Sequence, residues 1–109
     1  MTLRHADEKA AQHARAPRVA LSDIEGKIVY RYDATAAQMI NDPARHGALE
    51  VLSLCFLVMS NGFSIIGKSA PADARNFNAS FGRDLAYEDA IRQLWPLEGY
   101  LLRDRLSAS

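Results

Sequence analysis

The sequence predicts an α+β fold: an N-terminal helix, an antiparallel β-hairpin and a kinked C-terminal helical pair packed on the sheet. Three observations predict it. Asn61-Gly62 separates two apolar segments, which is typical of a tight hairpin turn. Tyr87 to Leu94 carries apolar residues at i, i+3, i+4 and i+7, the spacing of a helix face. Ser22-Asp23-Ile24-Glu25 has the pattern of a capping box, which marks a helix start.

Length and charge limit the organisation of the chain. Its 109 residues suffice for one small domain, which we place at residues 20–107. Residues 1–19 alternate charged residues with Ala and contain Pro17, so we expect a flexible arm with a transient helix. Thirteen basic and thirteen acidic residues give no net charge. This balance disfavours a nucleic-acid partner, because phosphate binding needs a basic surface.

The first helix is expected to begin at the Ser22 capping box. Ile24, Ile28 and Tyr32 would then lie on one helical face, although Gly26 costs about 1 kcal/mol relative to Ala. The following linker, residues 33–47, contains Pro43 and Gly47 and allows one extra helical turn over residues 34–40.

The hairpin is expected to join residues 49–59 to residues 63–66. A two-residue type I′ turn at Asn61-Gly62 would place Val58 opposite Ile65 and Phe56 opposite Gly67. The first strand is apolar on both faces, so each face needs a cover. Since a lone two-stranded ribbon is only marginally stable, we expect a homodimer or larger assembly.

The main helix is expected to follow Asn78, a good N-cap residue. Gly82 is costly in its first turn unless another element packs closely there. Pro96 lacks the N–H that a continuous helix needs, so we expect a stop or kink at Trp95. A second helical segment would then run from Leu97 to Leu106.

One motif suggests nucleotide chemistry. Residues 62–69, GFSIIGKS, match the phosphate-loop pattern G-x-x-x-x-G-K-[ST]. We interpret the match as spurious, because Phe63, Ile65 and Ile66 favour an extended strand while a phosphate loop must curl around its anion. We therefore expect no enzyme activity and no cofactor.

The remaining reactive residue types give no further site. The three histidines lack ligands at metal-binding spacing, so we expect no metal. Cys55 lies within an apolar run and is interpreted as a buried hydrophobic residue. No secretory signal or membrane span is found in the sequence, so we expect a location in the cytoplasm.

Several short segments resemble one protein family. These are NGF at 61–63, SA at 69–70, NF at 76–77, Gly82 before a helix, and WPLEGY at 95–100. Together they resemble a small family of tailed-phage and prophage proteins named after the gene 49 and gene 66 products of two phages. The resemblance covers about 80 residues and implies a phage accessory role in the host cell, with no defined activity.

These observations lead to two main functional hypotheses, beside a third that the neutral charge disfavours: a DNA-associated factor that uses Arg4, Lys9, Arg15 and Arg18 of the arm. The first is a non-enzymatic, homo-oligomeric binding module whose partner is a host or phage protein, with neither membrane nor nucleic acid involved. The alternative is a protein that sequesters a nucleotide-like small ligand, using Lys68, Arg83 and Arg103 between subunits. The candidate binding residues are of two kinds. No structural requirement explains Lys68, Asn76, Glu98 and Tyr100, and the cations Arg83 and Arg103 could bind an anion together with Lys68.

The hairpin and phosphate-loop interpretations predict different effects of two substitutions. Gly62→Val should unfold or aggregate the protein, because a β-branched residue does not adopt a positive φ. Lys68→Ala should leave the circular dichroism spectrum and any ATP hydrolysis unchanged. ATPase activity that disappears in Lys68→Ala would contradict this interpretation.

Overall fold

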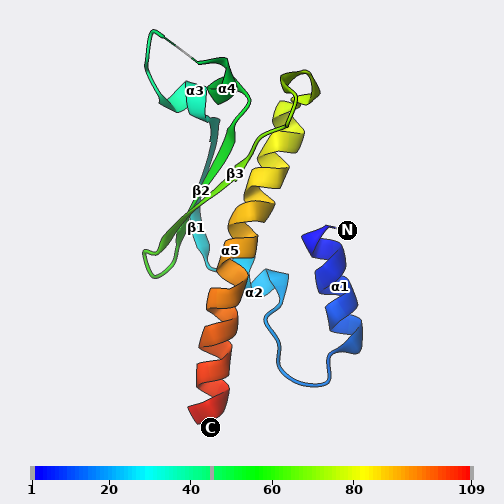
Figure 1. Cartoon of the computed structure of the whole chain (residues 1–109). Coiled ribbons are helices and arrows are strands. Elements are labelled where there is room, and N and C mark those ends of the chain that lie inside the picture. Colours follow the sequence, from blue (N-terminus) through cyan, green and yellow to red (C-terminus); the bar gives the residue numbers. More distant parts are fainter. Residues whose placement is uncertain (1, 45, 109) are drawn as a thin grey trace.

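The computed structural model describes residues 2–44 and 46–108. The strands form an antiparallel sheet in the order β1-β2-β3, and α5 lies across one face of it (Figure 1). The molecule is elongated, with extents of 56 × 30 × 17 Å, because α5 continues beyond the sheet. In chain order the elements are α1 (Leu3–His13), α2 (Leu21–Glu25), β1 (Ile28–Thr35), α3 (Ala36–Met39), α4 (Gly47–Glu50), β2 (Ser53–Met59), β3 (Ser64–Ser69), the 3-10 helix η1 (Ala74–Asn76) and α5 (Ala79–Ala108). The predicted α+β class is confirmed.

The first predicted helix is only one turn long, and the segment after it is a strand. The cap is Ala20, whose N–H donates to Asp23 Oδ2 at 2.8 Å, rather than Ser22. The helix ends at Gly26, and β1 pairs with β2 from Ile28 onward. The predicted helical face of Ile28 and Tyr32 was therefore wrong. Residues 28–32 are rich in β-branched and aromatic side chains, which favour a strand once a sheet is available to pair with.

The hairpin is confirmed, but its predicted turn and register were wrong. Met59 N–H donates to Phe63 C=O at 2.8 Å, so the loop has three residues, 60–62. Gly62 adopts a φ of 88°, and Asn61 Oδ1 accepts a hydrogen bond from Phe63 N–H at 3.0 Å. This is the geometry of a three-residue loop with a left-handed residue. Gly67 consequently lies opposite Cys55, one position from the predicted register.

The phosphate-loop pattern falls on this hairpin. Residues 64–69 form β3, which pairs along its length with β2. Lys68 lies in an extended strand, so the segment does not curl around an anion as a phosphate loop must.

The C-terminal helical pair is a single continuous helix. Asn78 Oδ1 accepts from Phe81 N–H at 3.0 Å, as expected for the N-cap. From there α5 extends for 30 residues, about 45 Å, with Pro96 inside it. Of the predicted stop or kink at Trp95, the stop was wrong, while the kink stays a prediction. Burial explains this outcome, because Leu94 and Glu98 on either side of the proline are both buried and hold the helix in place.

Two glycines set the distance between α5 and the sheet. A Cβ atom on Gly67 would lie 2.0 Å from Ala86 O and 2.6 Å from Ala90 N, so the strand backbone touches the helix backbone. A Cβ atom on Gly82 would lie 2.4 Å from Ser53 Oγ. The expected close contact at Gly82 is thus confirmed. The core lies between α5 and the sheet, with residues of α2 at one end. It contains Leu21, Ile24, Cys55, Leu57, Met59, Ala86, Ala90, Ile91 and Leu94.

Most of the predicted N-terminal arm, residues 3–13, is the helix α1, which contacts the domain. Asp7 Oδ1 accepts from Arg18 Nη1 at 2.7 Å and from Leu21 N–H at 3.0 Å. The hydrogen bond from Arg18 is the main cause that lowers the pKa of the Asp7 carboxyl. Leu3 packs against the core. These contacts hold α1 beside α2, while the flexibility of the arm stays a prediction.

The contact at Gly67 generates a prediction about stability. Gly67→Ala should lower the free energy of unfolding by about 3 kcal/mol or more, because two backbones must separate to admit the methyl group. The control is Gly99→Ala in α5, where a Cβ meets nothing within 4 Å. That control should stabilise the protein by up to about 1 kcal/mol. Urea unfolding measures both, and equal effects of the two substitutions would contradict the close-contact interpretation.

Candidate functional site

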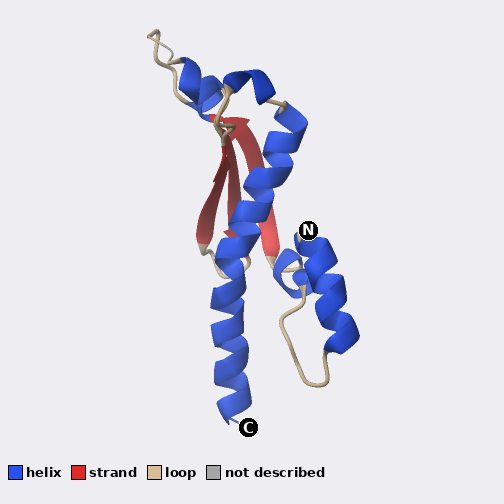
Figure 2. Cartoon of the chain, turned by 45° about the vertical axis from the view of Figure 1, so that its right-hand side comes forward, coloured by secondary structure: helices blue, strands red, loops and turns tan. Residues whose placement is uncertain are grey.

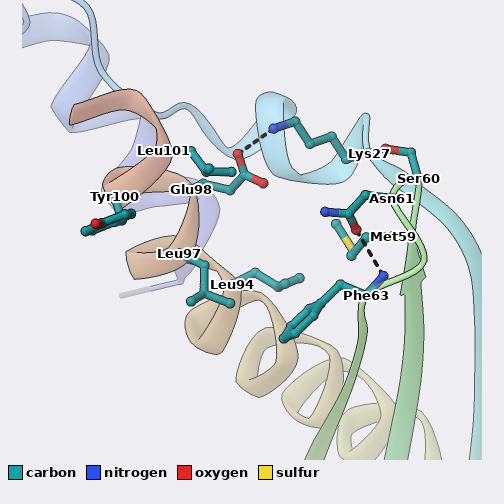
Figure 3. Close-up of a pocket in the computed structure, with 10 residues that line it drawn as sticks. All are labelled: Lys27, Met59, Ser60, Asn61, Phe63, Leu94, Leu97, Glu98, Tyr100 and Leu101. Atoms are coloured by element: carbon teal, nitrogen blue, oxygen red, sulfur yellow. Dashed lines mark hydrogen bonds and ion pairs between the residues drawn. The ribbon is translucent and has the colours of Figure 1, made fainter. Parts of the chain in front are cut away.

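An apolar groove lies between the hairpin loop and the C-terminal half of α5. Its volume is about 380 Å³ (Figure 3). The hairpin contributes Met59 and Phe63, and the helix contributes Leu94, Leu97 and Leu101. The groove exists because α5 continues past the end of the sheet while the hairpin loop does not follow it.

A charged pair lies at one side of this groove. Glu98 is only 9% exposed, and its Oε2 atom lies 2.6 Å from Lys27 Nζ (Figure 3). Carboxylates are buried in proteins only when paired, so Lys27 is what permits Glu98 to interrupt the apolar side of α5. The groove thus offers apolar walls together with one anchored carboxylate and one ammonium group.

A second cavity, of about 400 Å³, lies between α1, α5 and β1. Tyr87 Oη donates to Glu25 Oε2 at 2.6 Å, and the Arg31 guanidinium lies 4.1 Å from the centre of the Tyr87 ring. Burial, followed by the hydrogen bond to Glu25, raises the pKa of the Tyr87 hydroxyl. Because these polar groups are already paired with one another, this cavity offers a ligand less than the groove does.

The sheet presents a third surface, the face turned away from α5, which we call the open face. Tyr30, Tyr32 and Ile66 are 56%, 48% and 52% exposed on it. The Tyr32 and Phe56 rings lie 6.4 Å apart between centroids. Figure 2 shows no helix covering this side of the strands in the part of the chain that the structure describes. Alternation along the three strands assigns to it Tyr30, Tyr32, Leu54, Phe56, Val58 and Ile66.

The candidate residues from the sequence are only partly brought together. Glu98 and Tyr100 both line the groove. Tyr100 is 73% exposed, and its ring points away from the hairpin (Figure 3). Asn76 lies in η1 beside a smaller cavity of about 170 Å³ near Gly82.

The three cations of the anion-binding hypothesis lie apart within one chain. Lys68 is exposed on β3, while Arg83 and Arg103 are exposed on α5. The two arginines are 20 residues apart on one helix, a separation of about 30 Å. An anion site that uses all three would need a second chain, so this alternative stays a prediction.

Sequence reasoning missed Lys27, the partner of Glu98. No role was predicted for Lys27, which lies in the turn between α2 and β1. A usable signal was present. Glu98 interrupts a row of leucines at 94, 97 and 101, and a carboxylate in such a row requires a cation from elsewhere in the chain.

These features define a small α+β protein with an apolar groove and an uncovered apolar sheet face. The described residues contain no cluster of three or more His, Cys, Asp or Glu side chains arranged to hold a metal ion. None of the described helices is both long enough and apolar enough to cross a bilayer.

Comparison with known proteins places the chain in a family. Residues 19–106 match the Phage protein (N4 Gp49/phage Sf6 gene 66) family. The chain belongs to this family of phage proteins, which has no specified function, and α1 lies outside the matched region. Neither the curated proteins nor the solved structures contain a match to it.

The Lys27–Glu98 pair predicts coupling between two substitutions. Lys27→Met and Glu98→Gln should each destabilise the protein, and the double variant should lose about 1 kcal/mol less than the sum, because Lys27 is 39% exposed and only partly desolvated. The control is the exposed Arg75–Asp73 pair, tested as Arg75→Met and Asp73→Asn, which should show no measurable coupling. Additive losses at Lys27 and Glu98 in urea unfolding would contradict the assigned role of the pair.

Proposed function

We propose that this phage protein is a non-enzymatic, homo-oligomeric binding module. The observation that carries the proposal is the open face, where side chains of β1 and β3 remain exposed and those of β2 between them are half-buried in one chain. Large contiguous apolar patches on soluble proteins mark interaction sites. A chain of this size also buries a small core, so association offers stability that the single domain lacks.

The groove supports the binding part of the proposal. Its walls suit an apolar side chain or a short helix from a phage or host protein. The Lys27–Glu98 pair and the Asn61 side chain, also in the lining, offer polar groups that can fix the orientation of such a segment. Sites of this kind combine an apolar lining with a few convergent polar groups. Because the groove lies beyond the sheet, association through the sheet leaves it accessible.

The surroundings of the nucleophilic groups support a role without catalysis. Burial raises the pKa of the Cys55 thiol to about 11, so the thiolate that would act as nucleophile is scarce at neutral pH. Lys68 lies in a regular strand. A binding role uses the surfaces that the fold exposes and requires no activated group.

Light scattering at micromolar concentration tests the oligomeric part of the proposal. The wild-type protein should have at least twice the chain mass of 12.0 kDa. Tyr32→Asp, which places a charge on the open face, should reduce the mass to that of one chain. The matched control is Tyr100→Asp, which charges the most exposed tyrosine outside the sheet and should leave the mass unchanged. A wild-type protein with the mass of one chain would contradict the proposal.

A further inference from the structure

The two edges of the sheet differ in whether their outward-pointing backbone groups have hydrogen-bond partners. At the β3 edge, α5 supplies side chains that satisfy outward-pointing backbone groups. Asp89 Oδ2 accepts from Lys68 N–H at 2.9 Å, and Gln93 Nε2 donates to Ile66 C=O at 2.9 Å. Gln93 also donates to Asp89 at 3.2 Å, which holds the two side chains together. This edge is therefore closed to a further strand.

Within the part of the chain that the structure describes, the β1 edge has no such cover over its centre. Met59 bonds to Phe63, so the odd-numbered residues of β2 direct their backbone groups to β3 and the even-numbered ones direct theirs to β1. The even residues of β2 lie opposite even residues of β1, so it is the even-numbered residues of β1 that bond to β2. The N–H and C=O groups of Arg31 and Asp33 therefore point away from the sheet. A bulge between Ile28 and Tyr30 bounds this segment on one side. On the other side, Thr35 N–H is bound by Gln38 Oε1 at 2.8 Å. The open, regular part of the edge is centred on Tyr32.

We propose that β1 pairs antiparallel with β1 of a second copy of this chain, with the two-fold axis at Tyr32. The inference rests on the proposed homo-oligomeric function and assigns its interface and register. In this register Arg31 lies opposite Asp33 of the second copy, and Asp33 lies opposite its Arg31. The neighbouring symmetric registers place Arg31 opposite Arg31 or Asp33 opposite Asp33. Like charges directly opposite each other destabilise a strand pair, so the charges select one register.

The side chains at this edge are suited to that arrangement. Within one chain, Arg31 Nε lies 2.9 Å from Asp33 Oδ2, on the face of the sheet toward α5. Asp33 Oδ1 is buried and has no hydrogen-bond partner among the described residues. The pairing brings a second guanidinium to a strand position whose Cα is about 5.5 Å from that of Asp33. The two Arg–Asp pairs then form a ring of four alternating charges, and the carboxylate gains a second donor group.

In the proposed dimer the uncovered β1 edges are paired with each other. Two three-stranded sheets become one continuous sheet, and both of its outer edges are β3 strands closed by Asp89 and Gln93. The two-fold axis stands perpendicular to the sheet, so both α5 helices lie on the same side. The two open faces merge on the other side, with the Tyr32 pair at the centre. The assembly is closed at two copies, because no uncovered edge is left to add a third.

Cysteine cross-linking tests the register. In Tyr32→Cys the two Cα atoms should lie about 4.5 Å apart, within the range of about 4.4–6.8 Å for a disulfide. The matched control is Tyr30→Cys, which lies two residues away on the same exposed face. In the proposed register residue 30 lies opposite Ala34 of the second copy. The two copies of residue 30 are therefore four residues, roughly 13 Å, apart along the strand, and they should not cross-link. Under mild oxidation Tyr32→Cys should give at least about ten-fold more linked dimer, measured by non-reducing electrophoresis. Wild type controls for the buried Cys55.

Other outcomes separate this inference from the proposed function. If light scattering shows a dimer and neither variant cross-links, the register at Tyr32 is wrong and the oligomeric function stands. Face-to-face stacking of the open faces would give that result, because packed sheets lie about 10 Å apart. Equal cross-linking of the two variants also overturns the register. A wild-type monomer contradicts both proposals.

Discussion

The structure depends on the direct contact between the backbone of α5 and the backbone of β3 at Gly67. Only glycine permits it, since a Cβ there would overlap both Ala86 and Ala90. The two alanines supply the smallest side chains that still favour a helix. Because α5 lies this close, Ile91 and Leu94 reach Leu57 and Met59, and the core closes without large residues at the crossing point. Asp89 and Gln93 reach the edge of β3 for the same reason.

The same contact determines what remains uncovered. One helix lying along β2 and β3 covers one face of a three-stranded sheet, and no element is left in the described chain for the other face. The strand β2 is apolar on both sides, so half of its side chains stay on the open face. The C-terminal half of α5 projects past the sheet, and between it and the hairpin loop lies the groove, with Lys27 in its lining. The uncovered β1 edge, the open face and the groove thus all follow from the packing of α5 against β3 at Gly67.

Much of this architecture could be predicted from the sequence, and the failures have identifiable causes. The hairpin, the Asn78 cap and the buried stripe of α5 follow from local chemistry, and each was predicted. Residues 24–32 satisfy both a helical and a strand pattern, and only the presence of β2 decides between them. Pro96 was predicted to stop or kink the helix, because the burial of its neighbours is not visible in the sequence. Lys27 meets Glu98 across 71 residues, so the sequence named Glu98 and Tyr100 as candidates without predicting the groove that they line.

Native-state hydrogen exchange tests the dependence on the Gly67 contact most directly. Amides of β2 and of α5 from residue 86 to residue 94 should exchange at one common, slowest rate, because they open only when the whole domain unfolds. Amides of α5 beyond Gly99 should exchange faster, since none of the described residues in that part of the helix is buried. If the C-terminal half of α5 were protected as strongly as the segment over Gly67, the helix would be held by contacts other than this crossing, and the account would be contradicted.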